Sequence, residues 1–142
     1  MRSRAIRYRS WVKVLVPTKS QHDKTLPEAE WEPWVRRTGQ LFEKHVTGYQ
    51  VSPHYKYEIE GNYLTDSGKW MREPNWVVSA YGTAKAIRTL VAAAKEELLV
   101  EMGRALDQES VSVESSMGGF EQYPIKDDDD ETNVVEGCSE AE

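Results

Sequence analysis

The first residues whose types and spacing could support chemistry are four carboxylates near the middle of the chain, Glu58, Glu60, Asp66 and Glu73. Glu58 and Glu60 share one face of a predicted strand at a separation of about 7 Å, which suits acid–base chemistry or a hard cation. Lys56 lies on that face as well, so cross-strand ion pairing also explains the group. Glu73 stands apart because it directly precedes a proline and a predicted strand, where it could instead fix the hairpin by accepting N–H bonds.

Aromatic side chains flank the same segment and could line a pocket for a flat organic molecule. His54 precedes them and is a further candidate in such a pocket. The predicted ligand-binding residues are Tyr55, Tyr57, Trp70, Glu73 and Trp76.

The sequence gives little support for a metal site or a catalytic nucleophile. The histidines His22, His45 and His54 form no H-x-x-x-H or H-x-H pair, and the single cysteine, Cys138, stands among carboxylates that raise a thiol pKa. The sequence contains no G-x-S-x-G, P-loop or G-x-G-x-x-G motif. We therefore expect no metal site and no cofactor, and leave any catalytic residue unassigned.

A basic arm opens the chain and gives a possible nucleic-acid interface. Its residues Arg2, Arg4, Arg7 and Arg9 are interleaved with Tyr8 and Trp11, which could stack on bases. However, the net charge is +6 over residues 1–24, -4 over 25–114 and -8 over 115–142. Acidic segments repel phosphates, so nucleic-acid binding is the less favoured interpretation.

The length of 142 residues accommodates one domain with a core. We predict a basic arm over residues 1–10, a folded domain over 11–114 and an acidic, disordered tail over 115–142, which could bind a basic partner protein. No apolar stretch is long enough for a transmembrane helix or a secretory leader, and a lone cysteine fits a reducing compartment, so a cytoplasmic location is expected.

Hydrophobic periodicity predicts six elements within the domain. They are strands at 11–16, 55–60, 75–81 and 110–113, and helices at 28–45 and 83–103. Thr25 and Glu28 fit a capping box at the first helix. The order βαββαβ, with two right-handed crossovers, predicts an α+β, ferredoxin-like sandwich: a four-stranded antiparallel sheet with two helices on one face.

The other face of that sheet is predicted to be open. In the first strand either Trp11, Lys13 and Leu15 or Val12, Val14 and Val16 occupy it, and both sets contain apolar groups. An exposed apolar sheet face usually marks an interface. We therefore expect a homodimer packed sheet to sheet, or a ligand-binding sheet.

Three short motifs occur in a recognisable order: Gly68-Lys-Trp70, then Glu73-Pro74 leading into Val77-Val78, then Gln108-Glu-Ser-Val111. This pattern resembles a family of small uncharacterised bacterial α+β proteins, over about residues 30–114. The resemblance implies a ferredoxin-like domain and no particular activity.

Three functions remain open at this level. The favoured one is a non-catalytic interaction or ligand-binding module that dimerises through its sheet. The alternatives are a small cofactor-independent enzyme of the dimeric α/β-barrel type, with its cavity around the predicted ligand-binding residues, and a nucleic-acid-binding accessory protein that uses the basic arm.

Overall fold

The computed structural model describes residues 5–52, 61–64, 68, 70–73 and 75–125. Its elements are, in chain order, β1 (Ser10–Pro17), α1 (Glu28–Glu43), β2 (Gln50–Ser52), β3 (Gly61–Leu64), β4 (Trp70–Glu73), β5 (Asn75–Gly82), α2 (Ala84–Glu97), α3 (Leu99–Ala105), β6 (Ser110–Ser115) and β7 (Gly119–Pro124). No helix among the described residues is both long and apolar enough to cross a membrane.

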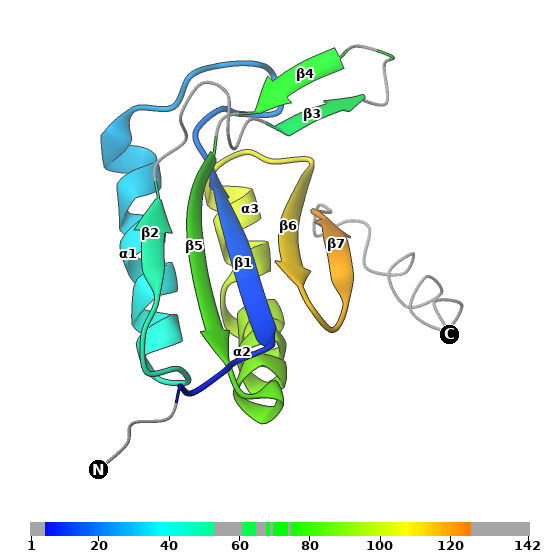
Figure 1. The fold of residues 1–142 in the computed structure, drawn as a ribbon. Helices are drawn as coiled ribbons and strands as arrows, with labels where there is room; N and C mark the ends of the chain where they lie inside the picture. The colour runs from blue at the N-terminus through cyan, green and yellow to red at the C-terminus, as the bar shows by residue number, and fades with distance from the viewer. Residues whose placement is uncertain (1–4, 53–60, 65–67, 69, 74, 126–142) are drawn as a thin grey trace.

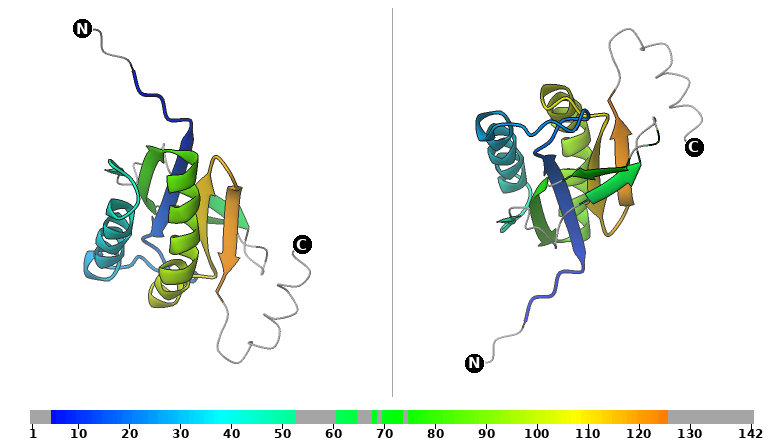
Figure 2. Two further views of the ribbon diagram at one scale, coloured as in Figure 1. Left: turned by 90° about the horizontal axis from the view of Figure 1, so that it is seen from below. Right: turned by 90° about the horizontal axis from the view of Figure 1, so that it is seen from above.

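Five strands form an antiparallel sheet in the order β2-β5-β1-β6-β7, and β3 and β4 form a separate two-stranded hairpin. The three helices lie on one face of the large sheet, while the β3–β4 hairpin lies at one end of it (Figures 1 and 2). The predicted α+β class, the antiparallel sheet and the placing of the helices on one face are thus confirmed. The predicted number of strands in this sheet is wrong, because β7 adds a fifth strand. The predicted number of helices is also wrong, because α3 is present.

The core lies between the sheet and the helices. Val12, Val14 and Val16 are fully buried against the helices, which decides the register that the sequence left open. They meet Phe42 of α1 and Leu90 of α2, each also fully buried. Burying the apolar stripe of each helix against one strand face is the main stabilising contribution to this arrangement.

The helix boundaries differ from those predicted from the sequence in two places. Helix α1 begins after Pro27 with no side-chain cap, because Thr25 instead pairs with Lys19 in an isolated bridge. The single predicted helix at 83–103 is divided at Leu98, whose φ of -127° breaks the helical path. The break allows the adjacent Leu98 and Leu99 to be buried together. The start of α2 at Thr83 is as predicted, and the Thr83 hydroxyl accepts from the Ala86 N–H at 3.1 Å.

The second half of the chain differs more from the elements predicted from the sequence. The predicted strand at 55–60 lies outside the described residues, and β2 pairs with β5 in its place. The sheet also runs past residue 114, the predicted end of the domain, because β7 pairs with β6 along its whole length. Ile125 then packs on the core and donates its backbone N–H to the Glu109 carbonyl at 2.9 Å. Residues 126–142 of the predicted tail lie outside the described part.

Gly103 tests whether Ile125 belongs to the folded domain. A Cβ at Gly103 would lie 2.5 Å from the Ile125 side chain and 2.9 Å from Val111. We expect Gly103→Ala to lower the free energy of unfolding by on the order of 1 kcal/mol, since overpacking exceeds the gain in helix propensity. Chemical denaturation measures this, with Gly48→Ala as control because nothing lies within 4 Å of a Cβ there. The cost should shrink in an Ile125→Ala background; equal costs in both backgrounds would contradict the contact.

Candidate functional site

The end of the sheet where β1 stops and β5 begins lies next to the described part of the predicted ligand-binding segment. Pro17 and Asn75 form the last pair between these two strands. Strand β4 ends at Glu73, two residues before Asn75, so the chain carrying Glu73 enters the sheet beside the chain leaving β1. The hairpin register sets Glu73 opposite Gly61 and Trp70 opposite Leu64. The structure therefore places Trp70 and Glu73 at opposite ends of one strand, at this end of the sheet (Figure 1).

Trp76 lies one residue further into β5, opposite Val16, and faces the helices. It stacks on Trp31 of α1 with 5.3 Å between ring centroids and an interplanar angle of 30°. Trp76 is therefore partly buried, close to where β4 leads into β5, and packs against the first turn of α1. The other predicted candidates in the segment, His54, Tyr55, Tyr57, Glu58, Glu60 and Asp66, lie outside the described residues.

Two loops meet at the same end and were not assigned a role from the sequence. One runs over residues 18–26 between β1 and α1, and the other over 106–109 between α3 and β6. Gln108 is almost fully buried and donates from Nε2 to the carbonyls of Lys19, at 2.6 Å, and Leu106, at 2.8 Å. The motif glutamine therefore joins the two loops. The sequence carried one signal for it, a polar amide just before a closing strand, but no pattern indicated its partner.

The open face of the sheet is apolar at its centre and charged beside it. Trp11 lies opposite Tyr81, and Leu15 lies opposite the buried Val77. Lys13 is opposite Glu114 on β6, and its ammonium lies 5.5 Å from the centre of the Trp11 ring. Tyr81, on β5, is 64% exposed, and Phe120, on the same face of the edge strand β7, is 58% exposed. The face away from the helices, toward the viewer in Figure 1, is thus exposed at one end, whereas Pro17, Asn75 and Val77 at its other end are buried.

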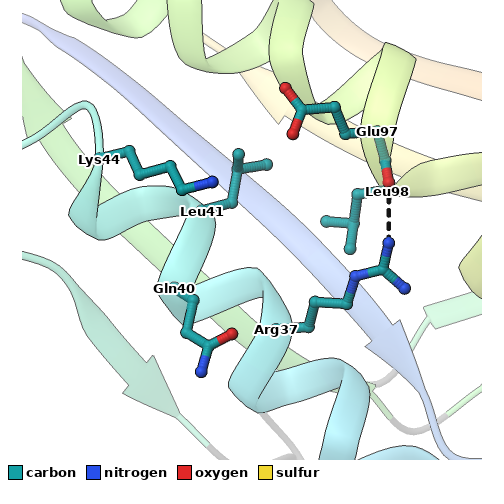
Figure 3. Close-up of a pocket in the computed structure, with 6 residues that line it drawn as sticks. All are labelled: Arg37, Gln40, Leu41, Lys44, Glu97 and Leu98. Carbon is teal, nitrogen blue, oxygen red and sulfur yellow. Dashed lines mark hydrogen bonds between the residues drawn. The ribbon is translucent and has the colours of Figure 1, made fainter.

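Two surface hollows lie away from this end. The larger, about 270 Å³, lies between α1 and α2 (Figure 3). Arg37 crosses it, donating to the Glu97 carbonyl at 3.2 Å and to Glu101 at 2.6 Å, with its guanidinium 4.8 Å from the Trp34 ring centre. These contacts brace α1 against α2 and α3. The second hollow, about 230 Å³, lies between α2 and the β6–β7 turn. Both are below the roughly 300 Å³ from which ligand pockets usually start.

The remaining sequence candidates are separate from one another. Arg7 and Arg9 are exposed on the segment before β1, while Arg2 and Arg4 lie outside the described residues. His22 is exposed in the loop at 18–26, and His45 is half-buried just after α1. Within the described part of the chain, no group of three or more His, Cys, Asp or Glu side chains could hold a metal ion.

One titratable cluster lies where α2 crosses the edge of the sheet. The Lys95 ammonium is 3.5 Å from a Glu121 carboxylate oxygen and 5.4 Å from the centre of the Tyr123 ring. Burial raises the pKa of Tyr123 above its ordinary value of 10.0, which outweighs the opposite influence of Lys95. The cluster attaches the edge strand β7 to α2, and we interpret it as structural.

No protein-family model and no curated protein matches this sequence. Among solved structures, the chain is similar to a phage SAM lyase in complex with S-methyl-5'-thioadenosine, with a TM-score of 0.53 and 17% identity over 89% of this chain and 96% of that one. It is also similar to a phage SAM lyase in the apo state, with a TM-score of 0.56 and 17% identity over 90% and 97%. At this identity the likeness shows a shared fold.

The comparison corrects the function favoured from the sequence. A non-catalytic interaction or ligand-binding module was expected, because no motif for a reaction is present. Both structural neighbours are an enzyme, and the shared fold extends over nearly the whole of both chains. The finding therefore points to the enzyme alternative, whose active residues need not form a contiguous motif.

The Tyr123 cluster gives a test of the geometry at the sheet edge. We expect the absorbance difference at 295 nm between the wild type and Tyr123→Phe to titrate with a midpoint above 10.0, because burial disfavours the phenolate. Lys95→Met should move the midpoint higher, since the nearby cation stabilises the phenolate, whereas Lys85→Met, exposed on the same helix, should leave it in place. A Tyr123 midpoint at or below 10.0 in the folded protein would contradict the burial.

Proposed function

We propose that this chain is a cofactor-independent lyase that cleaves S-adenosylmethionine (SAM) and releases S-methyl-5'-thioadenosine. The observation that carries the proposal is the fold shared with a phage SAM lyase over 89–90% of this chain and 96–97% of the other. Such coverage leaves little of either chain outside the common fold.

The chemistry is within reach of a small protein without a nucleophilic motif. SAM carries a sulfonium, and breaking the bond from sulfur to Cγ of the methionine part returns the electron pair to sulfur as a neutral thioether. The four-carbon fragment can close on itself when the substrate's own carboxylate oxygen attacks Cγ, giving homoserine lactone. It can instead lose a Cβ proton to a base, giving vinylglycine. In either case the protein has to orient the substrate and stabilise charge.

The residues at the β1–β5 end of the sheet fit these tasks. Glu73, where β4 leads into β5, would supply the anion for a substrate that carries an ammonium and a sulfonium. Trp76, three residues after Glu73, is held against α1 by its stack on Trp31. We assign Glu73 the principal role at this site.

The open sheet face supports self-association of the enzyme. Tyr81 and Phe120 are more than half exposed, and Trp11 and Leu15 lie on the same face on either side of Lys13. Apolar area of this kind is usually covered in an assembly. The sheet-to-sheet dimer expected from the sequence is therefore retained as part of the proposal.

Glu73→Gln tests the assignment of the site. We expect kcat/KM for the formation of S-methyl-5'-thioadenosine from SAM, followed by liquid chromatography, to fall by about 10²-fold or more, since an amide cannot supply the negative charge. The matched control is Glu96→Gln, which removes an exposed carboxylate from α2. Equal activity of the two variants would remove Glu73 from the site.

Labelled water identifies the type of reaction. A lyase that forms the lactone leaves the C4 oxygen unlabelled in H₂¹⁸O, because that oxygen comes from the substrate carboxylate and later ring opening labels the carboxyl group alone. Direct hydrolysis would place ¹⁸O on the C4 hydroxyl. Mass spectrometry of the homoserine formed distinguishes the two, and vinylglycine would appear instead if elimination occurs. Label at C4 would contradict a lyase.

The sheet-face interface is tested by placing positive charges at two of its exposed apolar positions. We expect the variant Tyr81→Lys, Phe120→Lys to have half the molar mass of the wild type in light scattering after size exclusion, with an unchanged far-ultraviolet spectrum, because each Lys would be buried without a partner in the dimer. The control is Val100→Lys, which charges an exposed apolar site on α3, on the other side of the molecule. A wild type that is monomeric at micromolar concentration would overturn the interface.

A further inference from the structure

The end of helix α3 holds a residue type that its backbone does not favour. The Asp107 N–H is 3.3 Å from the Arg104 carbonyl, and the Gln108 N–H donates to the Gly103 carbonyl at 2.8 Å. These two bonds make a Schellman motif, in which the residue after the cap takes a left-handed conformation and is usually glycine. Here that residue is Asp107, with a φ of 54°. A side chain at this position is disfavoured by the backbone, so some other interaction must account for it.

The Asp107 side chain has such an interaction. Its Oδ1 accepts a hydrogen bond from Nε2 of Gln21 at 2.8 Å, and its backbone carbonyl accepts one from the Gln21 N–H, also at 2.8 Å. The two residues are 86 positions apart in the sequence. A glycine at 107 would keep the backbone bond and the Schellman motif but would lose the side-chain bond. The carboxylate therefore serves to hold Gln21 rather than to end the helix.

Gln21 belongs to a loop that is already folded on itself. Within residues 18–26, the Ser20 N–H donates to the Lys24 carbonyl at 2.8 Å, and the Leu26 N–H donates to the Thr18 carbonyl at 2.9 Å. The loop is thus a short hairpin whose last residue, Leu26, is packed in the core, while the exposed residues 22–25 include its tip. Its attachments to the 106–109 turn are Gln21 near the tip and the buried Gln108, which holds the Lys19 carbonyl at the base.

The loop starts beside the proposed site. It leaves β1 directly after Pro17, the residue paired with Asn75, and Glu73 lies two residues before Asn75. We propose that Gln21 and Asp107 are positioning residues whose paired hydrogen bonds lock the loop at 18–26 in place beside Glu73, so that the site is shaped before the adenosyl sulfonium binds. This inference rests on the proposed function. Pre-organisation of a loop raises affinity by removing the cost of ordering it on binding.

Asp107→Gly separates this role from folding. Glycine suits the left-handed position, so the variant should fold with an unchanged or higher Tm while the side-chain bond to Gln21 is lost. We expect amides of residues 20–24 to exchange hydrogen about tenfold faster or more. We also expect KM for SAM and Kd for S-methyl-5'-thioadenosine to rise about tenfold with a smaller change in kcat. Asp107→Asn, which tolerates the same backbone and keeps an acceptor oxygen, should restore both values.

The outcomes separate the inference from the function on which it rests. Unchanged exchange in Asp107→Gly would overturn the lock, whatever the substrate is. Faster exchange with unchanged KM and Kd would show that the lock has no part in binding and would also overturn the inference. A wild type that neither binds S-methyl-5'-thioadenosine nor cleaves SAM would refute the proposed function, and with it the loop's role in binding, while the exchange experiment would still decide whether the two residues hold the loop.

Discussion

The antiparallel pairing of β1 with β5 is the constraint on which the rest of this structure depends. Eight residues of each strand are paired, from Ser10 with Gly82 to Pro17 with Asn75. Because the register is continuous, it sets both the face that Val12, Val14 and Val16 bury and the residues that meet at the strand ends. A shift by one residue would turn this valine row to the open face. The same shift would separate the start of the loop at 18–26 from the segment carrying Glu73.

The proposed site is built on loops and a hairpin that this rigid pair presents, a common division between scaffold and function. The scaffold is held by apolar burial. The two loops each place one leucine, Leu26 and Leu106, in the same core, and polar contacts join the loops to each other, from Gln108 to Lys19 and from Gln21 to Asp107. Polar contacts depend on direction, so they fix a loop in one position in a way that apolar packing does not. The left-handed Asp107 shows that a disfavoured backbone is retained where its side chain makes such a contact.

The proposed function also illustrates that a shared fold and a sequence motif carry different information. Absence of a nucleophile, a metal cluster or a phosphate loop favoured a non-catalytic module, but a sulfonium substrate carries its own leaving group and requires none of these. Such a reaction needs an oriented substrate and electrostatic stabilisation of the charge that changes during bond cleavage. Residues dispersed along a chain can provide both. Glu73 and Trp70 were identified as candidates because of their place in a hairpin. The likeness of fold then led to a proposed reaction in which a carboxylate would have a clear task.

Periodicity alone determined the local elements of this protein. The stripe of Val35, Leu41 and Phe42 predicted α1, and Thr83 predicted the start of α2, because each depends on neighbours within a few residues. Tertiary structure decided the rest. The buried face of β1, the division of the helix at Leu98, the addition of β7 and the pairing of Gln21 with Asp107 all depend on groups distant in sequence. Local propensity has no information about such partners, since their contacts exist only once the chain has folded.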